Sequence, residues 1–205
     1  MIATPPHVSA AVLRRRARLL VWATIGWNTI EAVVALGAGA AASSGALVSF
    51  GLDSTVEVSA ALIALWYLRG AGDARGRIAG RLIGASFWAL AAWVGFDAVG
   101  DLLEGARPDR SLVGIAVTAV SALVMPMLAR AKRRTGQALG SKALVSESSQ
   151  TAVCAYLSVA VLIGLVLSGF GWHWADPLAA LTVAVIAARE GLEAWRGELG
   201  EDGCC

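Results

Sequence analysis

The sequence predicts an all-α membrane protein, a bundle of six transmembrane helices with both termini in the cytoplasm. Hydrophobic residues make up 57% of the 205 residues, and the mean hydropathy of +0.67 is too high for a soluble domain of this size. The apolar residues form runs of about 20 residues, the length that crosses the hydrocarbon core of a bilayer. Short charged segments separate these runs, so we expect little room for a sizeable soluble domain.

The apolar runs define the expected organisation of the chain. We expect a cytoplasmic N-terminal tail at 1–18, a transmembrane domain at 19–196 and a short cysteine-containing cytoplasmic tail at 197–205. The six expected spans cover residues 19–42, 47–68, 82–103, 111–130, 144–169 and 177–195.

The first two expected spans carry acidic residues inside apolar sequence. Asn28 and Glu31 interrupt the first span about one helical turn apart, and they are candidates for a proton relay or for structural hydrogen bonding. The second span carries Asp53 and Glu57 four residues apart, so both project from one helix face, about 6 Å apart along the axis. A single divalent cation could contact both carboxylates.

The Asp53 and Glu57 pair needs compensation, because one acidic side chain at the centre of a spanning helix costs roughly 2.5 to 3.5 kcal/mol. A metal ion, a proton or a basic partner would supply it. We expect no Lys or Arg in the middle of any span, with Lys132 assigned to the connection between the fourth and fifth spans. A cation site is therefore favoured over a salt bridge.

The later spans differ in how much polar chemistry they carry. Asp97, toward the outer end of the third span, is a candidate for a place inside the bundle. In the fifth span Glu147 and Cys154 are seven residues apart, two helical turns, with Gln150 between them on one polar stripe. The sixth span is almost entirely alanine, valine, leucine and isoleucine, so we expect it to be a packing helix.

The residues of the polar stripe also have ordinary explanations. A buried cysteine often behaves as a small hydrophobic residue, and an intramembrane glutamine often hydrogen-bonds a neighbouring helix. Glu147, near the cytoplasmic end, is either an ion ligand, a residue that guides the ion inward, or a solvated side chain.

Basic residues lie almost entirely on one side of the expected bundle. Of the 17 Lys and Arg residues, only Arg107 and Arg110 fall on the opposite side. The positive-inside rule then places both termini in the cytoplasm of a multi-pass plasma-membrane protein. Because these charges flank span ends, anionic lipid headgroups are the expected partners and nucleic acid is not.

The three cysteines do not form a disulfide framework. Cys154 lies within the fifth span, whereas Cys204 and Cys205 are adjacent at the C-terminus, where a cytoplasmic thiol stays reduced. This tail is either a site that captures metal or a frayed acidic segment. An enzyme is disfavoured, because with only His7 and His173 no nucleophile can be given a base and an orienting group.

Several motifs, in their order and spacing, resemble the membrane domain of the cation diffusion facilitators. The sequence ASSGAL at 42–47, followed by Asp53 and Glu57, resembles the family's second helix, which carries two ligands four residues apart. FDAV at 96–99 resembles an acidic position of the third helix, and GWHWADPLAAL at 171–181 resembles the run that opens the sixth. The resemblance covers the membrane part only, and we expect this chain to lack the family's usual C-terminal cytoplasmic domain.

The resemblance implies a homodimeric antiporter that exchanges protons for a divalent metal. In the family's pattern Asp53 and Glu57 bind the ion, Gln150 and Cys154 complete the ligand set, and Glu147 stands near a common acidic position. Most relatives carry His or Asp and then Asp where this chain has Gln and Cys. Zn²⁺ is the expected ion, with Cd²⁺, Co²⁺, Fe²⁺ or Mn²⁺ as others, and no prosthetic group is implied. The alternative is a non-transporting membrane protein of the same fold that senses metal or scaffolds a partner.

Overall fold

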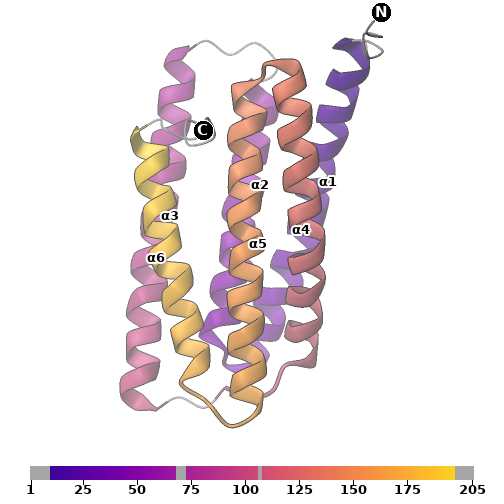
Figure 1. Ribbon diagram of the computed structural model, residues 1–205. Helices are drawn as coiled ribbons and strands as arrows, with labels where there is room; N and C mark the ends of the chain where they lie inside the picture. The colour runs from indigo at the N-terminus through magenta and orange to yellow at the C-terminus, as the bar shows by residue number, and fades with distance from the viewer. Residues whose placement is uncertain (1–9, 68–72, 106–107, 197–205) are drawn as a thin grey trace, which may run out of the picture.

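The computed structural model describes residues 10–67, 73–105 and 108–196, and within these ranges it is all-helical. The helices run antiparallel in one elongated bundle (Figure 1). Their bounds are α1 Ala10–Ala42, α2 Gly45–Tyr67, α3 Asp73–Glu104, α4 Leu112–Leu139, α5 Lys142–Gly169 and α6 Ala175–Arg196.

Four of the described helical segments are long and apolar enough to cross a membrane by length and composition. They are α1, α4, the part of α3 from Gly84 and the part of α5 from Glu147. The predicted helical class is therefore confirmed. The count of six spans and the cytoplasmic placement of the termini stay predictions.

The helices are longer than the apolar runs suggested. α1 begins at Ala10, so the segment 10–18 that we expected in a loose tail is helical, and residues 1–9 lie outside the described part. α4 continues past Arg130 to Leu139, because basic side chains do not stop a helix and the next breaker is Gly140, with φ 63°. Ser141 then caps α5 by accepting a hydrogen bond from the Leu144 amide.

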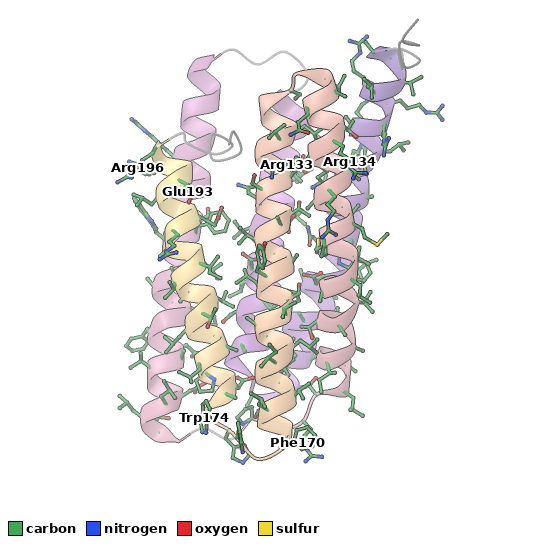
Figure 2. The ribbon with its side chains drawn as sticks, in the orientation of Figure 1. Arg133, Arg134, Phe170, Trp174, Glu193 and Arg196 are labelled. Carbon is green, nitrogen blue, oxygen red and sulfur yellow. The ribbon has the colours of Figure 1, made fainter. Side chains whose placement is uncertain are left out.

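The surface of the bundle fits a lipid environment. Large apolar side chains are exposed along the helices, among them Phe96 and Leu103, each 84% exposed. Figure 2 shows Arg133, Arg134 and Arg196 toward one end, which we call the arginine end, and Phe170 and Trp174 at the other, which we call the tryptophan end. Trp172 and Trp174 stack at this second end with ring centroids 5.7 Å apart. Aromatic residues are typical of membrane interfaces.

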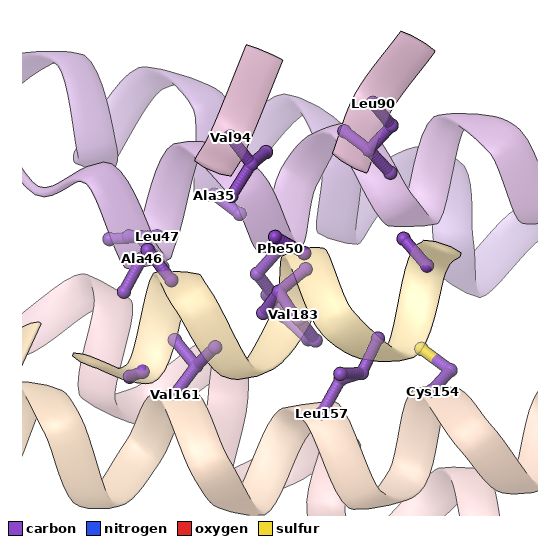
Figure 3. Close-up of a cluster of buried hydrophobic side chains, with 14 of the residues drawn as sticks. Ala35, Ala46, Leu47, Phe50, Leu90, Val94, Cys154, Leu157, Val161 and Val183 are labelled. Atoms are coloured by element: carbon purple, nitrogen blue, oxygen red, sulfur yellow. The ribbon is translucent and has the colours of Figure 1, made fainter. Parts of the chain in front are cut away.

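The helices pack as two groups that meet at α2 and α5. α1, α2, α4 and α5 form one group, whereas α3 and α6 pack mainly against each other. At the tryptophan end Asp176, the second residue of α6, accepts hydrogen bonds from the Ser44 hydroxyl (2.6 Å) and the Ala46 amide (3.3 Å), which ties α6 to the start of α2. Between the groups lies an apolar core that includes Phe50, Leu157 and Val183 (Figure 3).

Candidate metal site

Asp53 and Glu57 are buried near the middle of the bundle, as the sequence predicted. Their exposed fractions are 6% and 4%. α2 is in contact with α1, α3, α5 and α6, so side chains on its different faces meet four other helices at close range. The four-residue spacing keeps both carboxylates on the inward side of this central helix.

A small cavity lies against these two carboxylates. Its volume is about 10 Å³, the space that one water molecule needs. The Oε2 atom of Glu57 is buried and has no hydrogen-bond partner among the described residues. The walls of the cavity come from α2, α3, α5 and α6, and they consist of Asp53, Glu57, Phe87, Gln150, Val153 and Glu190.

Glu190 is the residue of this cavity that the sequence interpretation missed. We expected α6 to be a packing helix only, and that expectation is wrong, since Glu190 is 9% exposed and lines the cavity. It also lies close enough to Asp53 for mutual electrostatic repulsion. The available signal was an acidic residue within an expected apolar span, which on its own favours a functional role.

Beside these carboxylates, Glu31 of α1 is the centre of a second polar cluster. Its carboxylate accepts hydrogen bonds from Trp27 Nε1 (2.7 Å), Ser54 Oγ (2.6 Å) and Ser121 Oγ, which come from three helices. The thiol of Cys154 donates to the same carboxylate at 3.9 Å and also interacts with Asp53 and Glu57. Trp27 Nε1 can only donate, and the serine hydroxyls and the thiol are able to donate, so the cluster can satisfy both oxygens of the Glu31 carboxyl group.

Lys132 corrects the expectation that no basic residue lies inside the bundle. It is fully buried within α4, and its Nζ forms a salt bridge with Glu147 Oε1 at 3.0 Å. The same ammonium donates to Thr151 Oγ1 at 2.8 Å, and Thr151 in turn donates to Glu57 Oε1 at 2.7 Å. We had placed Lys132 in a connection because the apolar run ends at Arg130, but α4 continues and turns Lys132 toward α5.

The three polar residues predicted to form one stripe on α5 therefore have different surroundings. Glu147 pairs with Lys132 of α4, Gln150 lines the cavity, and Cys154 turns toward Glu31. Since Lys132 precedes the end of α4 by seven residues, the ion pair lies about 10 Å inside the arginine end.

The accessory candidates lie farther from the cavity or lack assigned partners. Asn28 is fully buried, and neither atom of its amide has a hydrogen-bond partner in the described part of the chain. Asp97 is half-buried beside Gly45. Gly45 precedes Asp53 on α2 by eight residues, so Asp97 lies about 12 Å from Asp53 along the helix axis. Cys204 and Cys205 lie outside the described residues.

The electrostatic balance of this region is strongly negative. Glu31, Asp53, Glu57, Glu147 and Glu190 are all buried, and Lys132 is the buried basic residue that the described ranges place among them. Within those ranges no group of three His, Cys, Asp or Glu side chains is already arranged to hold a metal ion. Three of these carboxylates, Asp53, Glu57 and Glu190, line the small cavity.

Comparisons with known proteins identify the family of this chain. Residues 76–198, more than half of the chain, match the family described as the cation efflux transmembrane domain. An uncharacterised transporter of Synechocystis is 31% identical over 82% of this chain and 58% of its own length. The magnetosome protein MamB of Magnetospira is 26% identical over 90% of this chain and 67% of its own length.

A third relative, the cation-efflux pump FieF of Shewanella oneidensis, is 28% identical over 45% of this chain and 31% of its own length. The chain thus spans between about one third and two thirds of these relatives. The family match nevertheless covers most of the bundle, including α4, α5 and α6. The protein therefore belongs to the cation efflux family, the cation diffusion facilitators that its motifs resemble.

Proposed function

We propose that this chain transports divalent metal cations across a membrane in exchange for protons. The observation that carries the proposal is the group of five buried carboxylates with a single buried lysine among them in the described ranges. Buried charge of one sign is costly unless cations neutralise it. A metal ion and protons are the mobile cations that would do so in alternation.

The proposed ligands lie on α2 and α5, the helices at which the two packing groups meet. Asp53 and Glu57 provide carboxylate oxygens from α2, and Gln150 provides an amide oxygen from α5. Cys154 and Glu147 stay proposals as further ligand and guiding residue, each now paired with another side chain. Because these groups do not yet converge, an arriving ion would draw α2, α5 and α6 together around the cavity.

The physiological ion is proposed to be Zn²⁺, which accepts carboxylate, amide and thiolate donors in a four-coordinate site. We further propose that the six helices span the plasma membrane with the arginine end in the cytoplasm, and that the working unit is a homodimer. The basic side chains Arg133, Arg134 and Arg196 at this end support the orientation.

A flux assay tests the proposal. The purified chain is reconstituted into liposomes that contain a zinc-sensitive dye, and a pH gradient is imposed in each direction. We expect proton-driven Zn²⁺ movement for the wild type and none for Asp53→Asn, which removes a ligand charge without removing volume.

Asp109→Asn is the matched control, because Asp109 is an exposed carboxylate in the α3–α4 connection. Its flux should equal that of the wild type. If the wild type moves no metal in either gradient direction, transport is refuted, and the non-transporting sensor or scaffold of the same fold becomes the better explanation.

A further inference from the structure

Glu190 occupies a position that neither the family match nor its motifs assign to metal binding. It lines the cavity from α6, together with the two carboxylates of α2 and Gln150 of α5. α6 packs mainly against α3, so Glu190 places a carboxylate of the α3–α6 pair where this pair meets α2 and α5.

Close packing against α3 fixes which way α6 faces. A Cβ atom on Gly84 would lie 2.7 Å from the Gly191 carbonyl oxygen, and one on Gly191 would lie 2.6 Å from Trp88 Cδ1. Trp88 also donates a hydrogen bond to the Ala188 carbonyl oxygen at 3.3 Å, and its ring stacks on Trp195 with centroids 5.2 Å apart.

These contacts keep the glycine face of α6 against α3. Successive helical residues point about 100° apart, so when Gly191 faces α3, Glu190 is turned to the side of that contact, where the cavity lies. With α6 in this rotation, the side chain of Glu190 lines the cavity. The contact between α3 and α6 therefore determines where the Glu190 side chain lies.

The donors around the cavity are all oxygens. Three carboxylates and one amide line it, and none of the described lining residues is basic, so Glu190 has no cationic partner there. The buried Oε2 of Glu57 has no partner either. The thiol of Cys154 is not part of this lining, although it interacts with Asp53 and Glu57 as well as with Glu31.

We propose that Glu190, in place of the Cys154 thiol considered above, is a direct ligand of the transported ion. The cavity then binds a divalent cation through oxygen alone, from Asp53, Glu57, Gln150 and Glu190. This inference rests on the proposed transport function and names the donor set of the same site. Oxygen donors favour harder ions such as Mn²⁺, whereas thiolate favours Cd²⁺. The site then takes Zn²⁺ by its oxygen ligands and gives no special preference to Cd²⁺.

The test measures metal binding to the full chain purified in detergent, by titration with Zn²⁺, Cd²⁺ and Mn²⁺ separately. Glu190→Gln should weaken Zn²⁺ binding at least about tenfold, since even outer partners of metal ligands are worth 10-fold or more. Glu190→Cys should raise the Cd²⁺ to Mn²⁺ affinity ratio at least about tenfold, because it inserts a soft donor. A residue with only a packing role would not change this ratio.

Glu193→Gln is the matched control, three residues along the same helix and absent from the cavity lining. It should bind all three ions as the wild type does. Thermal unfolding of each variant confirms that the fold is kept, and the Cys variant gives an independent test should the Gln variant unfold.

The variants separate this inference from the proposed function. If Asp53→Asn loses Zn²⁺ binding while both Glu190 variants match the wild type in affinity and ion ratio, the assignment of Glu190 is overturned and the carboxylate site stands. If Glu190→Gln binds Zn²⁺ as tightly as the wild type but no longer transports it, Glu190 is also refuted as a ligand. If Asp53→Asn binds as tightly as the wild type, the site of the proposed function itself is refuted.

Discussion

The buried ion pair between Lys132 and Glu147 should dominate the stability of the arginine half of the bundle. The side chains are 0% and 2% exposed, so neither charge has access to water once its partner is removed. Lys132→Met would leave Glu147 with neither oxygen paired, since its Oε2 already lacks a partner in the described part of the chain. Breaking a buried pair from one side costs about 3 to 5 kcal/mol.

That loss converts to a large change in melting temperature. At roughly 2 to 4 °C per kcal/mol for a chain of this size, Lys132→Met should lower the Tm by about 6 to 20 °C. Thermal unfolding in detergent, followed by circular dichroism or dye binding, measures the shift. Arg134→Met is the control, because it removes the same charge from an exposed position two residues along α4.

The double variant gives the decisive comparison. Lys132→Met combined with Glu147→Gln removes both charges, so it should be more stable than the sum of the two single losses predicts. The reasoning is refuted if the single losses add, or if Lys132→Met melts within about 2 °C of Arg134→Met, which is less than one kcal/mol. Either result would mean that water reaches the pair.

Three further changes test the contacts around the site. Gly191→Ala places a methyl group against the Trp88 ring and should cost about 1 to 3 kcal/mol in thermal unfolding, and an unchanged Tm would show that α3 and α6 separate easily. Ser54→Ala removes the 2.6 Å donor from Glu31 and should cost about 1 to 3 kcal/mol, with a neutral result arguing that Glu31 is protonated or hydrated. Cys154→Ser keeps a donor toward Glu31 and should leave the Cd²⁺ to Mn²⁺ preference in competitive vesicle uptake unchanged, whereas a loss of Cd²⁺ preference would place the thiol on the ion.

The helical bundle and the central carboxylates follow from the sequence because they depend on local pattern. Apolar runs of spanning length predict helices, and the four-residue spacing of Asp53 and Glu57 predicts one face. Helix ends were less predictable, because the apolar run ends at Arg130 whereas α4 ends at Leu139, nine residues farther on and directly before Gly140. The end of an apolar run indicates where contact with lipid ends, whereas a glycine such as Gly140 indicates where the helix itself ends.

The partners of the site residues depend on helix rotation, which no single span determines. Lys132 and Glu147 are 15 residues apart across a turn, and only the contact between α4 and α5 shows that they meet. Glu190 reaches the cavity because Gly191 and Gly84 hold α6 against α3. Their identity as charged residues in or near apolar sequence was visible, but the direction in which each side chain points was not.

Asp53 and Glu57 lie between two environments that differ in their capacity for a mobile cation. Toward α1 and α4, Glu31 is held by several donors, and Glu147 has the ammonium of Lys132 on its Oε1, although its Oε2 has no partner in the described part of the chain. Toward α6, Glu190 and the free Oε2 of Glu57 have none among the described residues that line the cavity. Since a fixed partner must be displaced before an ion can bind and an unpaired oxygen need not be, the α6 side is where a cation gains most by binding. Lys132 neutralises Glu147 without a mobile cation, so fewer metal ions or protons are needed to balance the remaining buried carboxylates.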